Sequence, residues 1–176
     1  MACLLNIGRK VPCKSAVGGI KTVYFTDYGT MGNPTFDADD IITGLDGTPV
    51  YYQYDVKGTS ALETTVNSSR DNGTTFYTQT LNLTLTFLDA ATRNELKVLA
   101  HGRPQVVIED YNGNFFVVGL ENGAEVTGGS IATGAAMGDL SGFTLTFEAM
   151  EKTPPYFIEP TVIEAYTSAS QIDPTA

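Results

Sequence analysis

The sequence predicts a mainly β fold, a sandwich or barrel of two sheets with one flanking α-helix and long loops. The 18 glycines and the abundant threonines of this 176-residue chain indicate short strands joined by turns. Residues 81–87 (LNLTLTF) and 143–147 (FTLTF) alternate apolar and polar side chains, as a strand does when one face covers a core. Only residues 89–101 have the composition and the N-terminal cap of a helix. These three observations favour one β-rich domain over residues 1–176.

The longest predicted strand, residues 75–87, leads directly into the predicted helix. Its apolar side chains are expected on one face: Leu81, Leu83, Leu85 and Phe87. Asp89 is the expected N-cap, and Gly102 the expected stop. The apolar side of the helix is narrow and suits packing on a sheet: Leu88, Thr92, Leu96 and Leu99.

Further strands are expected at residues 19–27, 49–56, 60–67, 104–109, 115–120 and 142–150. We expect residues 60–67 to pair with residues 49–56 across the turn at 57–59. Residues 104–109 should form a hairpin with 115–120, because Asp-Tyr-Asn-Gly between them is a strong turn sequence. The two alternating segments resemble each other almost letter for letter, which predicts similar environments and a side-by-side arrangement.

Long segments between these strands are predicted to be loops or terminal extensions. Residues 28–47 form a polar insertion, and residues 121–142 hold six glycines that indicate a flexible surface loop. Residues 1–16 are expected to form an N-terminal arm, and residues 160–176 a terminal strand or tail.

The charge and the termini exclude several classes of function. A net charge of −10 and a pI near 4.3 argue against a site that grips a phosphate backbone. An acidic surface keeps a protein soluble, or repels a polyanion that must pass without sticking. We expect no signal peptide and no membrane span. Cys3 and Cys13 are interpreted as reduced thiols of a protein made in a cytoplasm, with a disulfide as the alternative.

No residue pattern predicts an active site, a cofactor or a metal. The single histidine, His101, has no cysteine placed beside it by the sequence. Three close carboxylates at residues 37–40 lack the spacing of a calcium loop, so a solvated acidic loop is favoured. The glycines at residues 128–138 are not followed by the Lys-Ser/Thr of a phosphate cradle. Glu121 and Glu125 lack neighbours that would separate their pKa values. We therefore do not expect an enzyme.

Two segments carry a resemblance to a known family. Residues 8–29 (GRKVPCKSAVGGIKTVYFTDYG) and 117–158 (from VVGLENGAEV to KTPPYFI) resemble small structural proteins of tailed phages or prophages from Bacteroidetes-type hosts. The order of strands, one helix after a long strand and then a hairpin, is similar to that of tail tube (major tail) proteins. The resemblance lies in the general pattern and covers most of the chain.

The resemblance implies a β-sandwich with a flanking helix that forms hexameric rings, which stack into a hollow tube. It implies partners such as the tape measure and tail terminator proteins, passage of DNA without specific binding, assembly in the host cytoplasm and a final place in the virion tail. The two alternating strands would belong to the barrel, with their threonine-rich face toward the lumen or a neighbour.

On this interpretation the loops at residues 30–48 and 124–141 would supply contacts between subunits or rings. The candidate interface residues are Asp37, Asp39, Asp40, Gly128, Gly129, Ile131, Met137 and Asp139. Two alternatives stay open: another virion protein, such as a capsid decoration or head–tail connector protein, and an extracellular adhesin-like β-sandwich.

Overall fold

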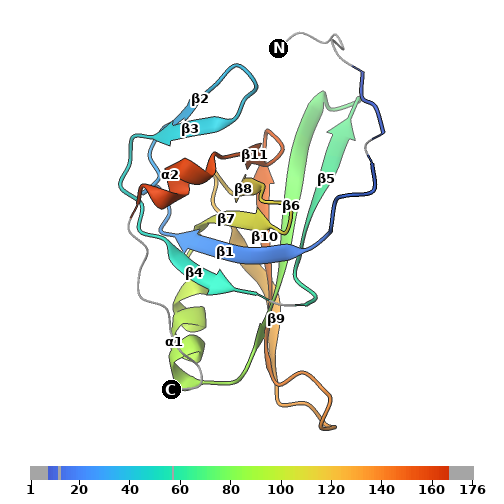
Figure 1. The fold of residues 1–176 in the computed structure, drawn as a ribbon, viewed down its shortest axis with the longest axis vertical. Helices are drawn as coiled ribbons and strands as arrows, with labels where there is room; N and C mark the ends of the chain where they lie inside the picture. The colour runs from blue at the N-terminus through green and yellow to red at the C-terminus, as the bar shows by residue number, and fades with distance from the viewer. Residues whose placement is uncertain (1–7, 12, 57, 167–176) are drawn as a thin grey trace.

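The computed structural model describes residues 8–11, 13–56 and 58–166, and these residues form a mainly β fold (Figure 1). The strands are β1 (Ile20–Thr26), β2 (Pro34–Phe36), β3 (Ile42–Leu45), β4 (Tyr52–Asp55), β5 (Ala61–Ser69), β6 (Thr74–Thr86), β7 (Gln105–Asp110), β8 (Phe115–Val118), β9 (Glu125–Ala132), β10 (Gly142–Glu151) and β11 (Tyr156–Phe157). The helices are α1 (Ala90–Leu99) and α2 (Pro160–Glu164).

Two sheets form the body of the molecule. The five-stranded sheet has the order β11-β8-β7-β1-β4, and the four-stranded sheet has the order β5-β6-β10-β9. The strands β2 and β3 form a separate two-stranded hairpin. The neighbouring strands of these sheets pair antiparallel, so each strand can present one face to a core and the other to solvent or to a further layer.

The two alternating segments lie side by side, which confirms the expectation from their similar sequences. Strand β10 pairs with β6 along its whole length, and their apolar residues face each other in register: Leu81 with Phe147, Leu83 with Leu145, and Leu85 with Phe143. Because side chains alternate along a strand, these six residues lie on one face of the four-stranded sheet. That face covers the first hydrophobic core.

The first core fills the space between the two large sheets. The ring of Phe25 in β1 lies 5.1 Å from that of Phe147 in β10, centroid to centroid. The central strand β7 contributes Val106 and Ile108, both almost fully buried. The helix α1 adds Leu96 to the same cluster. The architecture is therefore a sandwich with a flanking helix, as the sequence predicts.

A second core lies on the other face of the five-stranded sheet. The hairpin β2–β3 and the helix α2 cover that face and form a third layer (Figure 1). The buried members of this cluster are Met31, Ile42, Tyr51, Val107, Val117, Ile158, Val162 and Ile163. Strand β7 is buried on both faces as a result, because Val107 points away from Val106 and Ile108.

The helix α1 begins as predicted but ends differently. The Asp89 Oδ2 atom accepts a hydrogen bond from the backbone N–H of Thr92 at 2.7 Å, which confirms the N-cap. Phe87 does not continue the apolar face of β6: its φ of 69° turns the chain, and its side chain is 59% exposed. Leu88 is exposed as well. Gly102 does not adopt a positive φ. Ala100, whose backbone is in the right-handed helical region, caps the C-terminus instead.

The expected pairing of residues 60–67 with 49–56 is wrong. Strand β4 pairs with β1, whereas β5 pairs with β6 in the other sheet. The chain crosses between the sheets after Val56, and the Ser60 Oγ atom accepts a hydrogen bond from the Thr84 N–H at the start of β5. The long strand β6 offers β5 a longer partner than the four residues of β4 would, which favours the observed pairing.

Three segments predicted as loops or tail contain regular structure. Residues 28–47 include the hairpin β2–β3, and the glycine-rich residues 121–142 include the whole of β9. Residues 160–164 form the helix α2, which begins at Pro160, a favoured residue for a first helical position. The remainder of the predicted tail, residues 167–176, lies outside the described residues, as do residues 1–7 and Pro12 of the predicted arm.

Candidate assembly surfaces

The three candidate aspartates lie together at the tip of the hairpin β2–β3. All of Asp37, Asp39 and Asp40 are exposed. The Asp37 Oδ1 atom accepts hydrogen bonds from the backbone N–H groups of Asp39 and Ile41, each at 2.9 Å. This carboxylate therefore closes the turn, and the other two point their charge into solvent. We call residues 37–40 the acidic tip.

The two candidate glycines lie in a strand, so the prediction that they belong to a flexible loop is wrong. Gly128 pairs with Thr146 and Gly129 with Leu145 in the β9–β10 ladder. A β-carbon at Gly129 would lie 2.6 Å from the carbonyl oxygen of Thr144, so only glycine fits without a backbone shift. Gly129 permits close approach of a neighbouring backbone, as expected, but that backbone belongs to the same chain; a β-carbon at Gly128 would meet no atom within 4 Å.

The remaining candidates follow in the same ribbon. Ile131 is 64% exposed near the end of β9, and Met137 is fully exposed in the connection to β10. The Asp139 Oδ2 atom accepts hydrogen bonds from the N–H groups of Ala135 at 2.9 Å and Ala136 at 2.8 Å. These bonds hold the connection in a fixed turn and lower the pKa of Asp139. The eight candidates thus form two separate groups, the acidic tip and the β9–β10 ribbon.

A groove that the sequence does not reveal lies between α1 and the strands β9 and β10. Its volume is about 650 Å³. The lining residues are Arg93, Asn94, Leu96, Lys97, Val126, Gly128, Gly129, Ser130, Ile131, Phe143 and Leu145. The only sequence signal for it is the spacing of Arg93 and Lys97, which places two cations one turn apart on the exposed side of a helix. Of the predicted candidates, Gly128, Gly129 and Ile131 line this groove.

The outer face of the four-stranded sheet is mainly polar, although Met150 of β10 lies on it and is 55% exposed. The Thr146 Oγ1 atom donates a hydrogen bond to the Asn82 Oδ1 atom at 3.0 Å, and the hydroxyls of Ser130 and Thr144 lie 2.7 Å apart. Such cross-strand pairs of polar residues stabilise an exposed sheet face. None of the strands β5, β6, β9 and β10 contains a lysine or arginine; their charged residues are Glu63, Glu125, Glu148 and Glu151.

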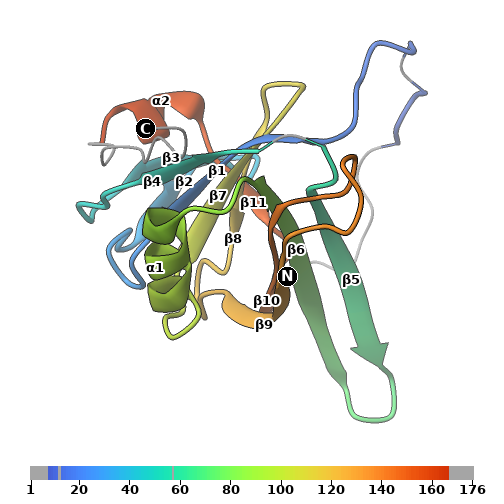
Figure 2. The same cartoon turned by 90° about the horizontal axis from the view of Figure 1, so that it is seen from below.

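The four-stranded sheet ends in two open edges, and one of them extends into a projecting hairpin. Strands β5 and β9 are its edge strands. The outer part of the β5–β6 hairpin projects beyond the other elements (Figure 2). Val66 is 59% exposed and Phe76 is 38% exposed on this part. Apolar side chains on a hairpin that lacks a covering layer are typical of a surface that another chain covers.

Buried polar side chains fix the loop after β8 between the two sheets. Gln79 is 1% exposed; its amide oxygen accepts a hydrogen bond from the Gly119 N–H at 3.2 Å. The Glu151 Oε1 atom accepts hydrogen bonds from the N–H groups of Glu121 and Asn122. Burial raises the pKa of Glu151 despite these bonds. The two side chains serve as structural anchors and face neither the groove nor the acidic tip.

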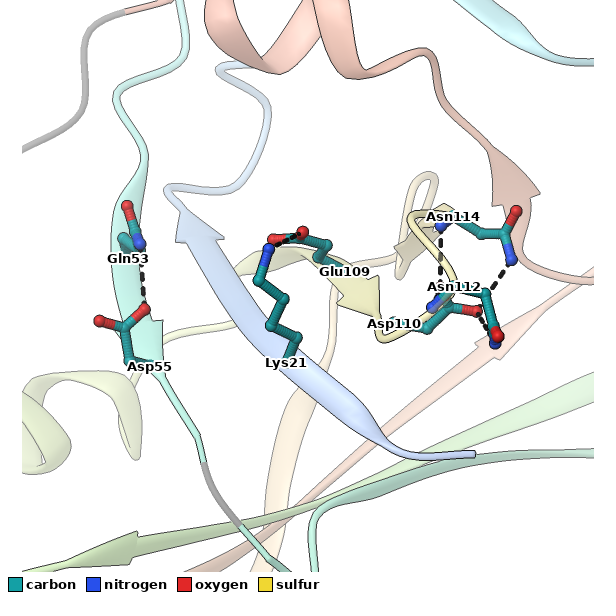
Figure 3. A network of polar contacts seen from close by, with 7 residues as sticks. All are labelled: Lys21, Gln53, Asp55, Glu109, Asp110, Asn112 and Asn114. Carbon is teal, nitrogen blue, oxygen red and sulfur yellow. Dashed lines mark hydrogen bonds and ion pairs between the residues drawn. The ribbon is translucent and has the colours of Figure 1, made fainter. Parts of the chain in front are cut away.

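Polar contacts connect strands of the five-stranded sheet and close the turn between β7 and β8 (Figure 3). Lys21 in β1 forms an ion pair with Glu109 in β7, two adjacent strands. The Asp110 Oδ1 atom accepts the N–H groups of Asn112 and Asn114, each at 2.8 Å, and so closes the predicted turn between β7 and β8. Burial acts to raise the pKa of Asp110, but the hydrogen bonds from Asn114 and Asn112 together lower it. These contacts stabilise the sheet, and Asp110 also lines a second cavity of about 400 Å³ beside β5.

The described residues contain no group of three or more histidine, cysteine or carboxylate side chains that could hold a metal ion. His101 follows α1 and is exposed, and Cys13 is an exposed free thiol. Cys3 lies outside the described residues, so its relation to Cys13 stays a prediction. Among the helices that the structure describes, none is long and apolar enough to cross a membrane.

Comparison of the chain with protein-family models, curated proteins and solved structures finds no match.

Proposed function

We propose that this protein is a virion structural protein that assembles into stacked hexameric rings and forms the tail tube of a tailed phage or prophage. The observation that carries the proposal is the four-stranded sheet, which has two open edges and a polar outer face without cations. The resemblance of residues 8–29 and 117–158 to phage structural proteins supports the same function.

The open edges favour pairing with further copies of the chain. Edge strands of stable monomers are usually protected by proline, lysine or bulges, because their free N–H and C=O groups attract other strands. Neither β5 (ALETTVNSS) nor β9 (EVTGGSIA) contains proline or lysine, and each has a single glutamate. The pairing of β5 has no register shift, whereas β9 has one, opposite Thr146 and Phe147 of β10. Lateral pairing of β5 in one copy with β9 in the next would extend the sheet around a ring and close it into a barrel.

The polar face and the net charge suit a conduit for DNA. Six copies at −10 each would give a strongly acidic ring. With the threonine-rich face of β6 and β10 toward the lumen, passing DNA would meet hydroxyls, amides and carboxylates. No cation of these strands would bind a phosphate, so the DNA would slide without sticking. Tape measure and tail terminator proteins would be the other partners, with assembly in the host cytoplasm and a final place in the virion.

A charge placed on the open edge tests the proposal. The variant Val66→Lys puts a cation on the exposed part of β5, and Val98→Lys is a matched control because Val98 is 68% exposed on α1. We expect Val66→Lys to abolish the sedimentation of assemblies in a pelleting assay, whereas Val98→Lys pellets like the wild type. Equal pelleting of all three proteins would remove the β5 edge from the interface.

A further inference from the structure

We propose that the groove between α1 and β9–β10 receives the acidic tip of the hairpin β2–β3 from a second copy of this chain. The inference rests on the proposed function, since it names the contact through which copies stack. It joins the two groups of candidate residues that lie apart within one copy.

The groove combines an apolar floor with a cationic rim. Leu96, Phe143 and Leu145 supply apolar surface, and Arg93 and Lys97 stand on the α1 side. Neither cation forms an ion pair with a carboxylate among the described residues, and no acidic residue lines the groove. In a chain with twice as many acidic as basic residues, such a rim selects an anionic occupant.

The acidic tip has the complementary chemistry. Three carboxylates and the exposed methyl group of Ala38 lie within four residues, and Phe36 beside them is 39% exposed. The bonds that Asp37 accepts from Asp39 and Ile41 hold the turn in one conformation. A preorganised tip loses little conformational entropy when it docks, which favours binding.

The positions of the two surfaces exclude contact within one copy. Figure 1 shows the hairpin β2–β3 at one end of the longest axis, and α1 with the lower part of β9 and β10 at the other. A tip that docks into the groove of another copy therefore makes a head-to-tail contact. Repeated along the same axis, this contact stacks copies in a row, whereas the sheet edges join copies side by side.

Charge reversal tests the contact. The tip variant combines Asp39→Lys with Asp40→Asn, which keeps the turn-forming Asp37 and places asparagine at the position with φ of 59°. The groove variant combines Arg93→Glu with Lys97→Glu. The control variant, Glu164→Lys with Glu159→Gln, makes the same change in charge as the tip variant on exposed residues of the third layer.

The readout is the protein concentration at which half of the chain pellets. We expect the tip and groove variants each to raise it by about tenfold or more, because like charges meet at the interface. Their combination should return it to within about threefold of the wild type. The control variant should match the wild type. Raising NaCl from about 50 mM to about 500 mM should raise the same concentration for the wild type, which tests the contact without any substitution.

The other outcomes separate this inference from the proposed function. If the tip and groove variants form tubes as well as the wild type does, and if the wild type forms them equally at both salt concentrations, the inference is overturned. The tail tube proposal would still stand. Charge-dependent rows of copies without rings would support the inference and overturn the tail tube. A wild-type chain that stays monomeric throughout would overturn both.

Discussion

The two hydrophobic cores lie on opposite faces of the same five-stranded sheet, but the sequence encodes them in different ways. The core between the sheets is built from long alternating strands such as β6 and β10. The second core combines Val107 and Val117 of the five-stranded sheet with residues from short segments, among them Met31, Ile42 and Ile163. We therefore expect the sandwich to be the more stable body and the third layer to depend on it.

The largest expected effect comes from breaking the core between the sheets. Phe147 is completely buried and contacts Phe25 across the sandwich. The substitution Phe147→Ala should lower the free energy of unfolding by roughly 3–5 kcal/mol, through lost burial and the cavity that remains. Urea denaturation measures this. Val98→Ala on exposed α1 is the control and should stay within about 0.5 kcal/mol of the wild type.

A smaller and more local effect is expected in the second core. Ile42 is fully buried, and its carbonyl oxygen accepts a hydrogen bond from the Glu159 N–H at 2.9 Å. The substitution Ile42→Ala should cost roughly 2–4 kcal/mol. Hydrogen exchange should accelerate in β2, β3 and α2 while β6 and β10 stay protected. Equal acceleration in β6 would show that the two cores unfold as one unit.

The cap of α1 tests how firmly the helix closes the first core. Asp89→Ala removes the bond to the Thr92 N–H and should cost about 1 kcal/mol, against little change for the exposed Glu95→Ala. That bond lowers the pKa of Asp89 below 3.8. The hydrogen bond therefore stabilises the fold fully above the pKa that Asp89 has in the unfolded chain. This stabilisation is lost as pH falls through the pKa that Asp89 has in the folded chain. Chemical denaturation at several pH values measures both effects.

Glu151 gives the opposite dependence on pH. Burial raises the pKa of Glu151 above 4.5, so the folded chain favours its protonated form. The resulting stabilisation is complete below the pKa that Glu151 has in the unfolded chain. It declines as pH rises through the pKa that Glu151 has in the folded chain. Glu151→Gln keeps an oxygen that can accept the two N–H groups but does not titrate. The stability of the wild type relative to this variant should fall as pH rises above 4.5 and through the raised pKa of the folded chain. A constant difference would contradict the raised pKa.

The smallest effect is expected from a pair of tyrosines in the second core. The Tyr51 hydroxyl is buried and has no hydrogen-bond partner in the described residues, so Tyr51→Phe should be neutral or slightly stabilising. The Tyr166 hydroxyl donates to the Leu45 carbonyl oxygen at 2.9 Å, and Tyr166→Phe should cost about 1 kcal/mol. Thermal unfolding compares the two, and a larger cost at Tyr51 would indicate a partner for its hydroxyl.

Local patterns predict most of the first core and little of the second. Alternation identifies the faces of β6 and β10, and turn chemistry identifies the β7–β8 hairpin with its Asp110 turn. Sheet membership of β4 and β5 depends on long-range partners, which no local pattern contains. The second core is predicted only in part: Val107 and Val117 lie in the two expected hairpin strands, whereas Met31 and Ile42 lie in a segment whose sequence resembles a loop.

The candidate assembly surfaces show the same division. The exposure of the acidic tip follows from its composition, since three carboxylates in four residues favour solvent. Gly128 and Gly129 resemble a loop in sequence, yet both lie within β9, where the close approach of the Thr144 carbonyl requires glycine at position 129. The groove joins α1 to the later strands β9 and β10, so it emerges only when the helix packs beside them.

The most direct test of the tail tube is negative-stain electron microscopy of the purified wild-type chain, paired with its mass in solution. We expect six-membered rings or hollow tubes whose walls are single stacked rings. Trimers or twelve-membered rings would assign the protein to the capsid or the connector. A chain that stays monomeric at high concentration, even with preformed tail tips present as initiators, would contradict the account.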